Sequence, residues 1–155
     1  MPKSVGVESY LHIDGFDALP RDFFNKRMIR AGMRKAGRIV EGRAQLSIAL
    51  ARGQGNYPVN RTGELLHAIK FRVSRSGFLV RIAPVKTAGM KEFYPAYLWY
   101  GVRRGAKRGK SHRKQAATGS WRIAPRANYM ADALQDSEND IRRILSDAFN
   151  RALGG

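Results

Sequence analysis

The sequence of 155 residues contains no cysteine. Disulfide bonds, zinc sites built on thiolates and cysteine nucleophiles are therefore excluded. It also lacks an apolar run near the roughly 18 residues that a membrane-spanning helix needs. The polar start at Met1–Gly6 is unlike a secretory signal peptide, in which a long apolar stretch follows a basic one. From these absences we expect a soluble protein with no membrane partner.

Acidic residues are also few. Asp and Glu number 12 against 29 Lys and Arg, so the formal net charge is +17. Between Arg52 and Asn128 the only carboxylates are Glu64 and Glu92, whereas a two-metal nuclease needs several that converge. The three histidines form no metal-binding pair at helical spacing, and no phosphate-binding glycine loop is present. We expect no catalytic, metal-binding or cofactor-binding residues, and hence no enzyme.

Apolar residues make up 43% of the chain, enough for one packed core, and the length predicts a single domain over residues 1–155. The positive charge is unevenly distributed. Residues 20–52 hold nine basic and two acidic groups, a balance of +7, and residues 103–114 hold seven basic groups and no acid. Such an asymmetry is typical of a subunit that contacts neighbours through some faces and a polyanion through another.

Two long helices are predicted. The first runs over about 20–52, because Pro20 suits a first turn and apolar residues recur at steps of three and four, at Ile29, Met33, Ala36, Val40, Ala44 and Ile48. Glycines at steps of five within it, at Gly32, Gly37 and Gly42, indicate a kink or close packing as readily as an interface. The second, over about 128–153, has the same periodicity at Met130, Leu134, Ile141, Leu145, Ala148 and Ala152.

The clearest β feature is an antiparallel hairpin over 68–84. Ile69, Phe71 and Val73 alternate with polar residues, and Ser76-Gly77 predicts a tight turn before a second alternating run. Short strands are expected over 5–14 and 121–123. The predicted class is α+β, with the two long helices packed on a small antiparallel sheet that contains the hairpin.

Two short helical segments complete the expected elements. Thr62 is placed to cap one helical turn over residues 64–68. The aromatic segment 94–100 predicts a short helix that begins at Pro95 and ends before Gly101.

A flexible basic arm is expected over 103–120, where Gly, Ser, Lys and Arg dominate. Its cations suit contact with phosphates in any sequence, and contact with an acidic protein is an equally strong interpretation. The residues assigned to either contact are Arg103, Arg104, Lys107, Arg108, Lys110, Arg113 and Lys114. Nearby aromatic residues favour a core or a subunit interface over base stacking. These are Tyr94, Tyr97, Trp99, Tyr100, Trp121 and Tyr129.

The order of several motifs resembles the tail-completion, or head–tail joining, proteins of the neck of long-tailed double-stranded DNA bacteriophages. Members typically show a Thr-Gly-x-Leu turn after a long first helix, and this chain has Thr62, Gly63, Leu65 and Leu66. A Tyr-x-x-Tyr-x-x-x-Gly segment matches residues 94–101, and Pro125 to Ala133 matches the start of the last helix. The resemblance covers about residues 20–153. Trp99-Tyr100-Gly101 stands where the family often has an acidic residue before the aromatic-Gly pair, and the insertion at 103–120 is longer and more basic.

The resemblance implies a structural virion protein. Such subunits form a homo-oligomeric ring, usually a hexamer, between the head-closure (connector) proteins and the tail terminator or tail tube. Double-stranded DNA passes through the centre of the ring. The protein would be assembled in the cytoplasm of the host bacterium and end in the virion. The alternative is a sequence-independent nucleic-acid-binding protein that acts through the basic residues of 103–114.

Overall fold

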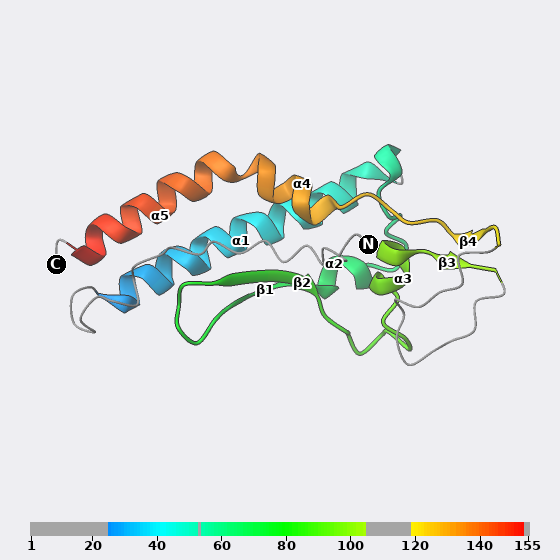
Figure 1. The fold of residues 1–155 in the computed structure, drawn as a ribbon, viewed down its shortest axis with the longest axis horizontal. Coiled ribbons are helices and arrows are strands. Elements are labelled where there is room, and N and C mark those ends of the chain that lie inside the picture. Colours follow the sequence, from blue (N-terminus) through cyan, green and yellow to red (C-terminus); the bar gives the residue numbers. More distant parts are fainter. Residues whose placement is uncertain (1–24, 53, 105–118, 154–155) are drawn as a thin grey trace. The chain divides into compact units, whose positions relative to one another are not determined.

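The computed structural model describes residues 25–52, 54–104 and 119–153. Figure 1 shows an α+β fold with a long first helix, a two-stranded antiparallel hairpin and helices at the end of the chain, as the sequence predicts. The strand expected over 5–14 and the arm residues 105–118 lie outside the described residues. None of the described helices is long and apolar enough to cross a membrane.

Helix α1 (Lys26–Ala51) begins where Asn25 caps it. The Asn25 side-chain Oδ1 accepts a hydrogen bond from the backbone N–H of Arg27 at 3.1 Å, and the Asn25 carbonyl accepts one from Met28 at 3.0 Å. Asn25 itself is not helical, so the expected start near residue 20 is wrong. The preference of Asn for the cap position overrides the signal from Pro20. All six residues of the predicted apolar face are buried.

The remaining elements follow in chain order. They are η2 (Gln54–Asn56), α2 (Glu64–Ala68), β1 (Ile69–Val73), β2 (Val80–Pro84), α3 (Pro95–Tyr100), β3 (Val102–Arg103), β4 (Trp121–Ile123), α4 (Tyr129–Asp136) and α5 (Glu138–Leu153). The strands form two separate two-stranded sheets, β1–β2 and β3–β4. The described chain divides into two compact units. Unit 1 takes residues 25–44, 70–83 and 130–153, and unit 2 takes residues 45–52, 54–69, 84–104 and 119–129.

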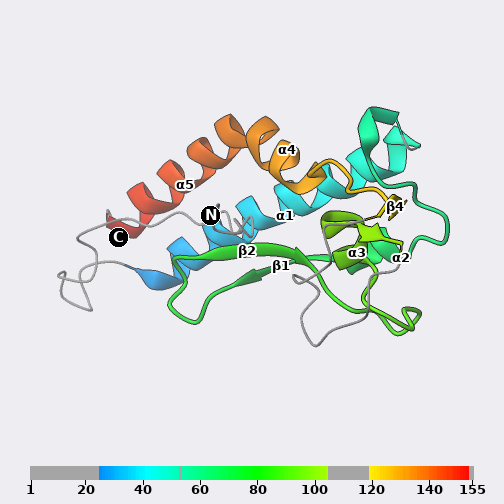
Figure 2. The ribbon, with the colours of Figure 1, turned by 45° about the vertical axis from the view of Figure 1, so that its right-hand side comes forward.

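In unit 1, α1 is the middle layer between α5 and the β1–β2 hairpin, as Figures 1 and 2 both show. Two glycines make this close packing possible. A Cβ atom at Gly32 would clash with the Cβ of Ala148 on α5, and a Cβ at Gly37 would lie 2.6 Å from the Phe71 ring of β1. The five-residue spacing therefore marks close packing on two different faces of the helix. Gly42 has open space around it.

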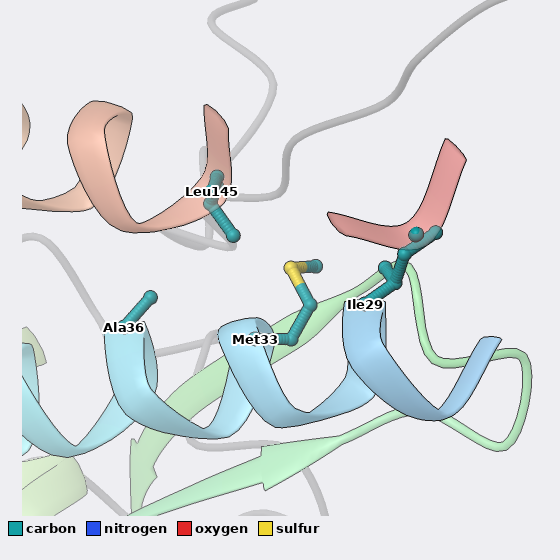
Figure 3. Packing of buried hydrophobic residues seen from close by; sticks show 5 residues of the cluster. Ile29, Met33, Ala36 and Leu145 are labelled. Atoms are coloured by element: carbon teal, nitrogen blue, oxygen red, sulfur yellow. The ribbon is translucent and has the colours of Figure 1, made fainter. Parts of the chain in front are cut away.

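The core of unit 1 is formed by apolar side chains from α1 and α5. Met33 and Ala36 point from α1 toward Leu145 on α5 (Figure 3). Hairpin residues such as Val73 and Val80 pack against the same cluster. At about 25 cal/mol per Å² of apolar surface removed from water, burial of this kind is the main stabilising contribution.

The last helical segment is divided at Ser137, whereas the sequence predicts one helix over 128–153. The side chain of Ser137 is fully buried, and its Oγ donates a hydrogen bond to the carbonyl of Ala133 at 2.7 Å. A serine that bonds back to the preceding turn competes with the helical ladder and bends it. Arg43 of α1 supports the bend, because its guanidinium donates to the Asp136 carbonyl that ends α4.

Candidate functional site

Segments that carry the resemblance meet within unit 2. The backbone N–H of Arg126 donates to the carbonyl of Leu98 in α3 at 2.8 Å. Gly101 directly follows α3 with a φ of 71°, and a Cβ at this residue would lie 2.8 Å from Pro125 Cδ. The end of α3 at Gly101 is as the sequence predicts. The segment that leads into α4 therefore packs directly on the C-terminal end of α3.

The Thr62–Leu66 turn differs from expectation in its cap. Thr62 is exposed, and the cap of α2 is Gly63, which has a φ of 81° and no side chain to accept a hydrogen bond. Asn60 Oδ1 accepts from the Gly63 N–H at 3.0 Å instead. Leu65 is buried and Leu66 is half-buried, so Gly63 sets the turn and Leu65 anchors it in the core.

Glu64 joins α2 to the loop between β2 and α3. Its carboxylate accepts a hydrogen bond from Thr87 Oγ1. Gly89 lies so close to the same carboxylate that a Cβ there would clash with it. This contact places a negative charge near Tyr94, the residue before α3, and thereby links the turn to the aromatic segment.

The tyrosines of this region are held in the neutral form. Burial raises the pKa of Tyr129 well above its ordinary value of 10, and the neighbouring Tyr94 raises it further. Burial also raises the pKa of Tyr94, and the Glu64 carboxylate adds to that effect. Glu64, Tyr94 and Tyr129 come from the three segments of the resemblance and influence one another electrostatically. At neutral pH both phenols keep their protons, and neither is poised to act as a base.

The six aromatic residues assigned to the core or an interface divide by exposure. Tyr129 is buried, with 7% of its surface exposed. Tyr94, Tyr97 and Trp99 are half-buried, and the Tyr97 hydroxyl donates to Glu92 Oε2 at 2.9 Å. Tyr100 and Trp121 are 37% and 42% exposed. Tyr129 thus belongs to the core, while an interface role for the two exposed rings stays a prediction.

The ends of the basic arm form a paired stem. The strand over 121–123 is as the sequence predicts, whereas its two-residue partner β3 carries no alternating pattern and was not predicted. Val102 pairs with Ile123 and Arg103 with Trp121. The Arg103 guanidinium lies over the Trp121 ring, 4.0 Å from its centroid, and donates to the Gly119 carbonyl at 2.8 Å. The Arg104 N–H donates to the Ser120 carbonyl at 3.0 Å. Arg103 therefore lies in β3 rather than in an arm.

The other assigned arm cations lie outside the described residues: Lys107, Arg108, Lys110, Arg113 and Lys114. A second concentration of positive charge, however, lies on unit 1. Exposed cations follow one side of α1 and the outer surface of the β1–β2 hairpin. We name these two groups of exposed cations together the basic face and define it by Arg34, Lys35 and Arg38 on α1 and by Lys70, Arg72 and Arg81 on the hairpin. The sequence contains the signal for it, in the charged residues that alternate with Phe71 and Val73.

Candidate metal ligands are absent from residues 25–52, 54–104 and 119–153, where no group of three or more His, Asp or Glu side chains could hold an ion. Searches against protein-family models, curated proteins and solved structures found no match to this chain.

Proposed function

We propose that this protein is a structural virion subunit of a bacteriophage neck, which joins or completes the tail as part of an oligomeric ring around the DNA channel. The observation that carries the proposal is the meeting of the resemblance segments in unit 2. Arg126 bonds to α3, Gly101 packs on Pro125, and Tyr129 lies near Tyr94. Motifs that match a family by chance need not contact one another in the fold, whereas motifs that belong to a common fold are expected to.

The proposed role is structural and involves no catalysis. A ring subunit needs a rigid frame, surfaces for its neighbours and a surface compatible with DNA. The packed layers of unit 1 supply the frame. Several large apolar side chains of unit 2 are exposed and available for subunit contacts. They are Leu46, Leu50, Val59, Phe93, Tyr100 and Trp121. Fully buried aromatic and apolar anchors are what hold such interfaces together.

Electron microscopy of assembling phage particles tests the proposal. A phage that lacks the gene for this protein should accumulate filled heads and separate tails, and wild-type protein supplied from a plasmid should restore joined particles. Joined, infectious virions in its absence would end the proposal. Native mass spectrometry of the purified protein or of isolated necks measures the number of subunits in the ring, which we expect to be six.

A second candidate is a sequence-independent nucleic-acid-binding protein that acts through the arm. The observation in its favour is the stem, since Arg103 and Trp121 tie both ends of the cationic segment to unit 2. This candidate requires the isolated protein to bind DNA with an affinity that falls steeply with salt. If the affinity for DNA depends only weakly on salt, and particles stay unjoined when the gene is deleted, the nucleic-acid-binding candidate is refuted and the neck-subunit proposal remains.

A further inference from the structure

The outer surface of the β1–β2 hairpin brings like charges together. Ser74 N donates to the Leu79 carbonyl at 2.8 Å, and Val85 N donates to the Ala68 carbonyl at 2.8 Å. Six residue steps separate these bonds on each strand, so Arg72 of β1 stands opposite Arg81 of β2. Both are exposed. Like charges directly opposite each other destabilise a strand pair.

The hairpin runs alongside the cationic part of α1. At the turn end, a Cβ at Gly77 would lie 2.6 Å from Arg30 Cγ. At the other end, Glu41 accepts a hydrogen bond from Phe71 N at 3.2 Å and lies 3.7 Å from Lys70 Nζ. The stretch of α1 between Arg30 and Glu41 is therefore the part that lies beside the hairpin.

Cations follow that stretch at helical spacing. Arg34 and Arg38 come four and eight residues after Arg30, so the three lie along one side of α1 over about 12 Å. Arg34, Lys35 and Arg38 are exposed. Like charges at a spacing of four destabilise a helix. Lys26 and Arg27 add to the cost, because cations in a first turn oppose the helix dipole.

In the described part of unit 1, several carboxylates are paired with cations outside the row of Arg34 and Arg38 on α1. Glu41 is the only carboxylate in α1, and it is occupied by Lys70 and by the backbone of Phe71. Asp140 pairs with Arg43 and Arg143, and Glu138 pairs with Arg142. Among the residues that the structure describes, Arg34, Lys35, Arg38 and Arg72 form no ion pair. The fold thus holds Arg34, Lys35, Arg38 and Arg72 on rigid elements without an ion pair of their own.

We propose that the basic face is a binding surface for the phosphate backbone of double-stranded DNA, separate from the arm and its stem. Duplex DNA presents about one negative charge per 1.7 Å of axis, and a row of cations that contacts it releases condensed counterions. Binding would also relieve the repulsion between like charges along α1. Lys and Arg directed at phosphates fix position without reading sequence. The proposal concerns unit 1 alone and does not depend on ring assembly.

The test measures binding of the full-length protein to a short duplex of mixed sequence as salt is raised from roughly 50 to 200 mM. The face variant combines Arg34→Gln, Lys35→Gln, Arg38→Gln and Arg72→Gln. Each neutralised phosphate contact contributes about 0.9 to the slope of log affinity against log salt. We expect the slope to fall by about 3 to 4, and the affinity at low salt to fall by about 100-fold or more.

Two controls accompany the face variant, and the first carries the same change of net charge. The scattered variant neutralises four exposed cations elsewhere, through Arg61→Gln, Lys86→Gln, Lys91→Gln and Arg151→Gln. The conservative variant, with Arg34→Lys, Arg38→Lys and Arg72→Lys, keeps the charge. Both should retain most of the wild-type slope. All substituted residues are exposed, and thermal unfolding followed by circular dichroism confirms that each variant folds.

Two results would overturn the proposal. One is an equal loss of slope in the face and scattered variants, which would show that only total charge matters. The other is a face variant that binds DNA like the wild type but loses affinity for poly-glutamate, which would assign the surface to an acidic protein. A phage that joins its tails without this protein would refute the neck function and leave a positive DNA result standing.

Discussion

Arg43 on α1 binds both sides of the bend between α4 and α5. Its Nη2 lies 2.8 Å from Asp140 Oδ2 in the first turn of α5, and its Nη1 donates to the carbonyl of Asp136. One side chain thereby satisfies the C-terminal end of one helix and the N-terminal end of the next. Carboxylates are favoured near a helix N-terminus, so Asp140 is suited to its place even apart from the ion pair.

Replacement of Arg43 by alanine should lower the free energy of unfolding by about 1 kcal/mol. The loss is moderate because the side chains of Arg43 and Asp140 are 40% and 38% exposed, so solvent screens the pair. Urea unfolding measures the change. Arg142→Ala is the matched control, since its pair with Glu138 is more exposed, and it should change stability by less than half as much. Equal effects in the two variants would refute a special role for Arg43.

Gly32→Ala should destabilise the protein although alanine is the better helix former. The added methyl group would clash with Ala148, and overpacking of this kind costs about 1–3 kcal/mol. Gly42→Ala is the control within the same helix. With open space around residue 42, it should stabilise the protein by about 0.5–1 kcal/mol. Opposite signs in thermal unfolding are expected, and the same sign in both variants would contradict the packing described for α1.

Gly101→Ala should be strongly destabilising because of its positive φ and because its side chain would clash. Gly55, which shares only the positive φ, serves as the control. Gly101 has a φ of 71°, and its added Cβ would lie 2.6 Å from Trp121 Cζ3 and 2.9 Å from the Ile123 carbonyl. Gly55 has a φ of 59° but open space around it. Gly55→Ala should cost only the strain of a left-handed residue, about 1–2 kcal/mol. Urea unfolding measures the free energy of unfolding of both variants. The amount by which Gly101→Ala loses more than Gly55→Ala reports the close contact between Gly101 and β4. Equal losses in the two variants would mean that this contact is loose.

Alkaline pH should destabilise the protein through Tyr129. Because the pKa of Tyr129 is raised in the folded state, its contribution to stability is complete below pH 10 and is lost as pH rises above that value. Above pH 10 the unfolded chain releases this proton and the folded chain keeps it, so stability falls by about 1.4 kcal/mol per pH unit. Tyr129→Phe removes this dependence.

The measurement compares denaturant unfolding of wild type and Tyr129→Phe from pH 8 to about pH 11. The difference in free energy of unfolding between wild type and Tyr129→Phe should stay constant up to pH 10, and should narrow or change sign only above it. Tyr100→Phe, which alters a more exposed ring, should leave the wild-type pH dependence intact. Curves of wild type and Tyr129→Phe that stay parallel throughout would show that Tyr129 ionises as easily folded as unfolded.

The long-range frame follows from apolar periodicity, because burial of one helix face is recorded directly in the sequence. The face from Ile29 to Ile48 is buried as predicted, and the helix at Pro95 and the hairpin form where the sequence predicts them. The boundaries are less readable, because single side chains decide them. Asn25 starts α1, Ser137 divides the last helix, and Gly63 replaces Thr62 as the cap of α2.

The candidate site was less predictable than the fold. The cations of 103–114 are conspicuous as a run, yet Arg103 pairs within a strand ladder and stacks on Trp121. The two-residue strand β3 depends on tertiary contact and no local pattern encodes it, whereas its partner over 121–123 was expected. The basic face was only partly readable, from the excess of cations in residues 20–52 and from the cations that alternate with Phe71 and Val73. Its residues are scattered through helix and hairpin, and only the strand register brings Arg72 opposite Arg81.

Close packing at Gly32 has a consequence for the evolution of this protein. Residue 32 and Ala148 share a space that holds one methyl group between them, since a second would clash. In related chains the two positions should covary, so that alanine at the first accompanies glycine at the second. The total volume across the pair would stay constant while its distribution between the two helices changes. Such an exchange would preserve the spacing of α1 and α5 even where the surrounding sequence has diverged.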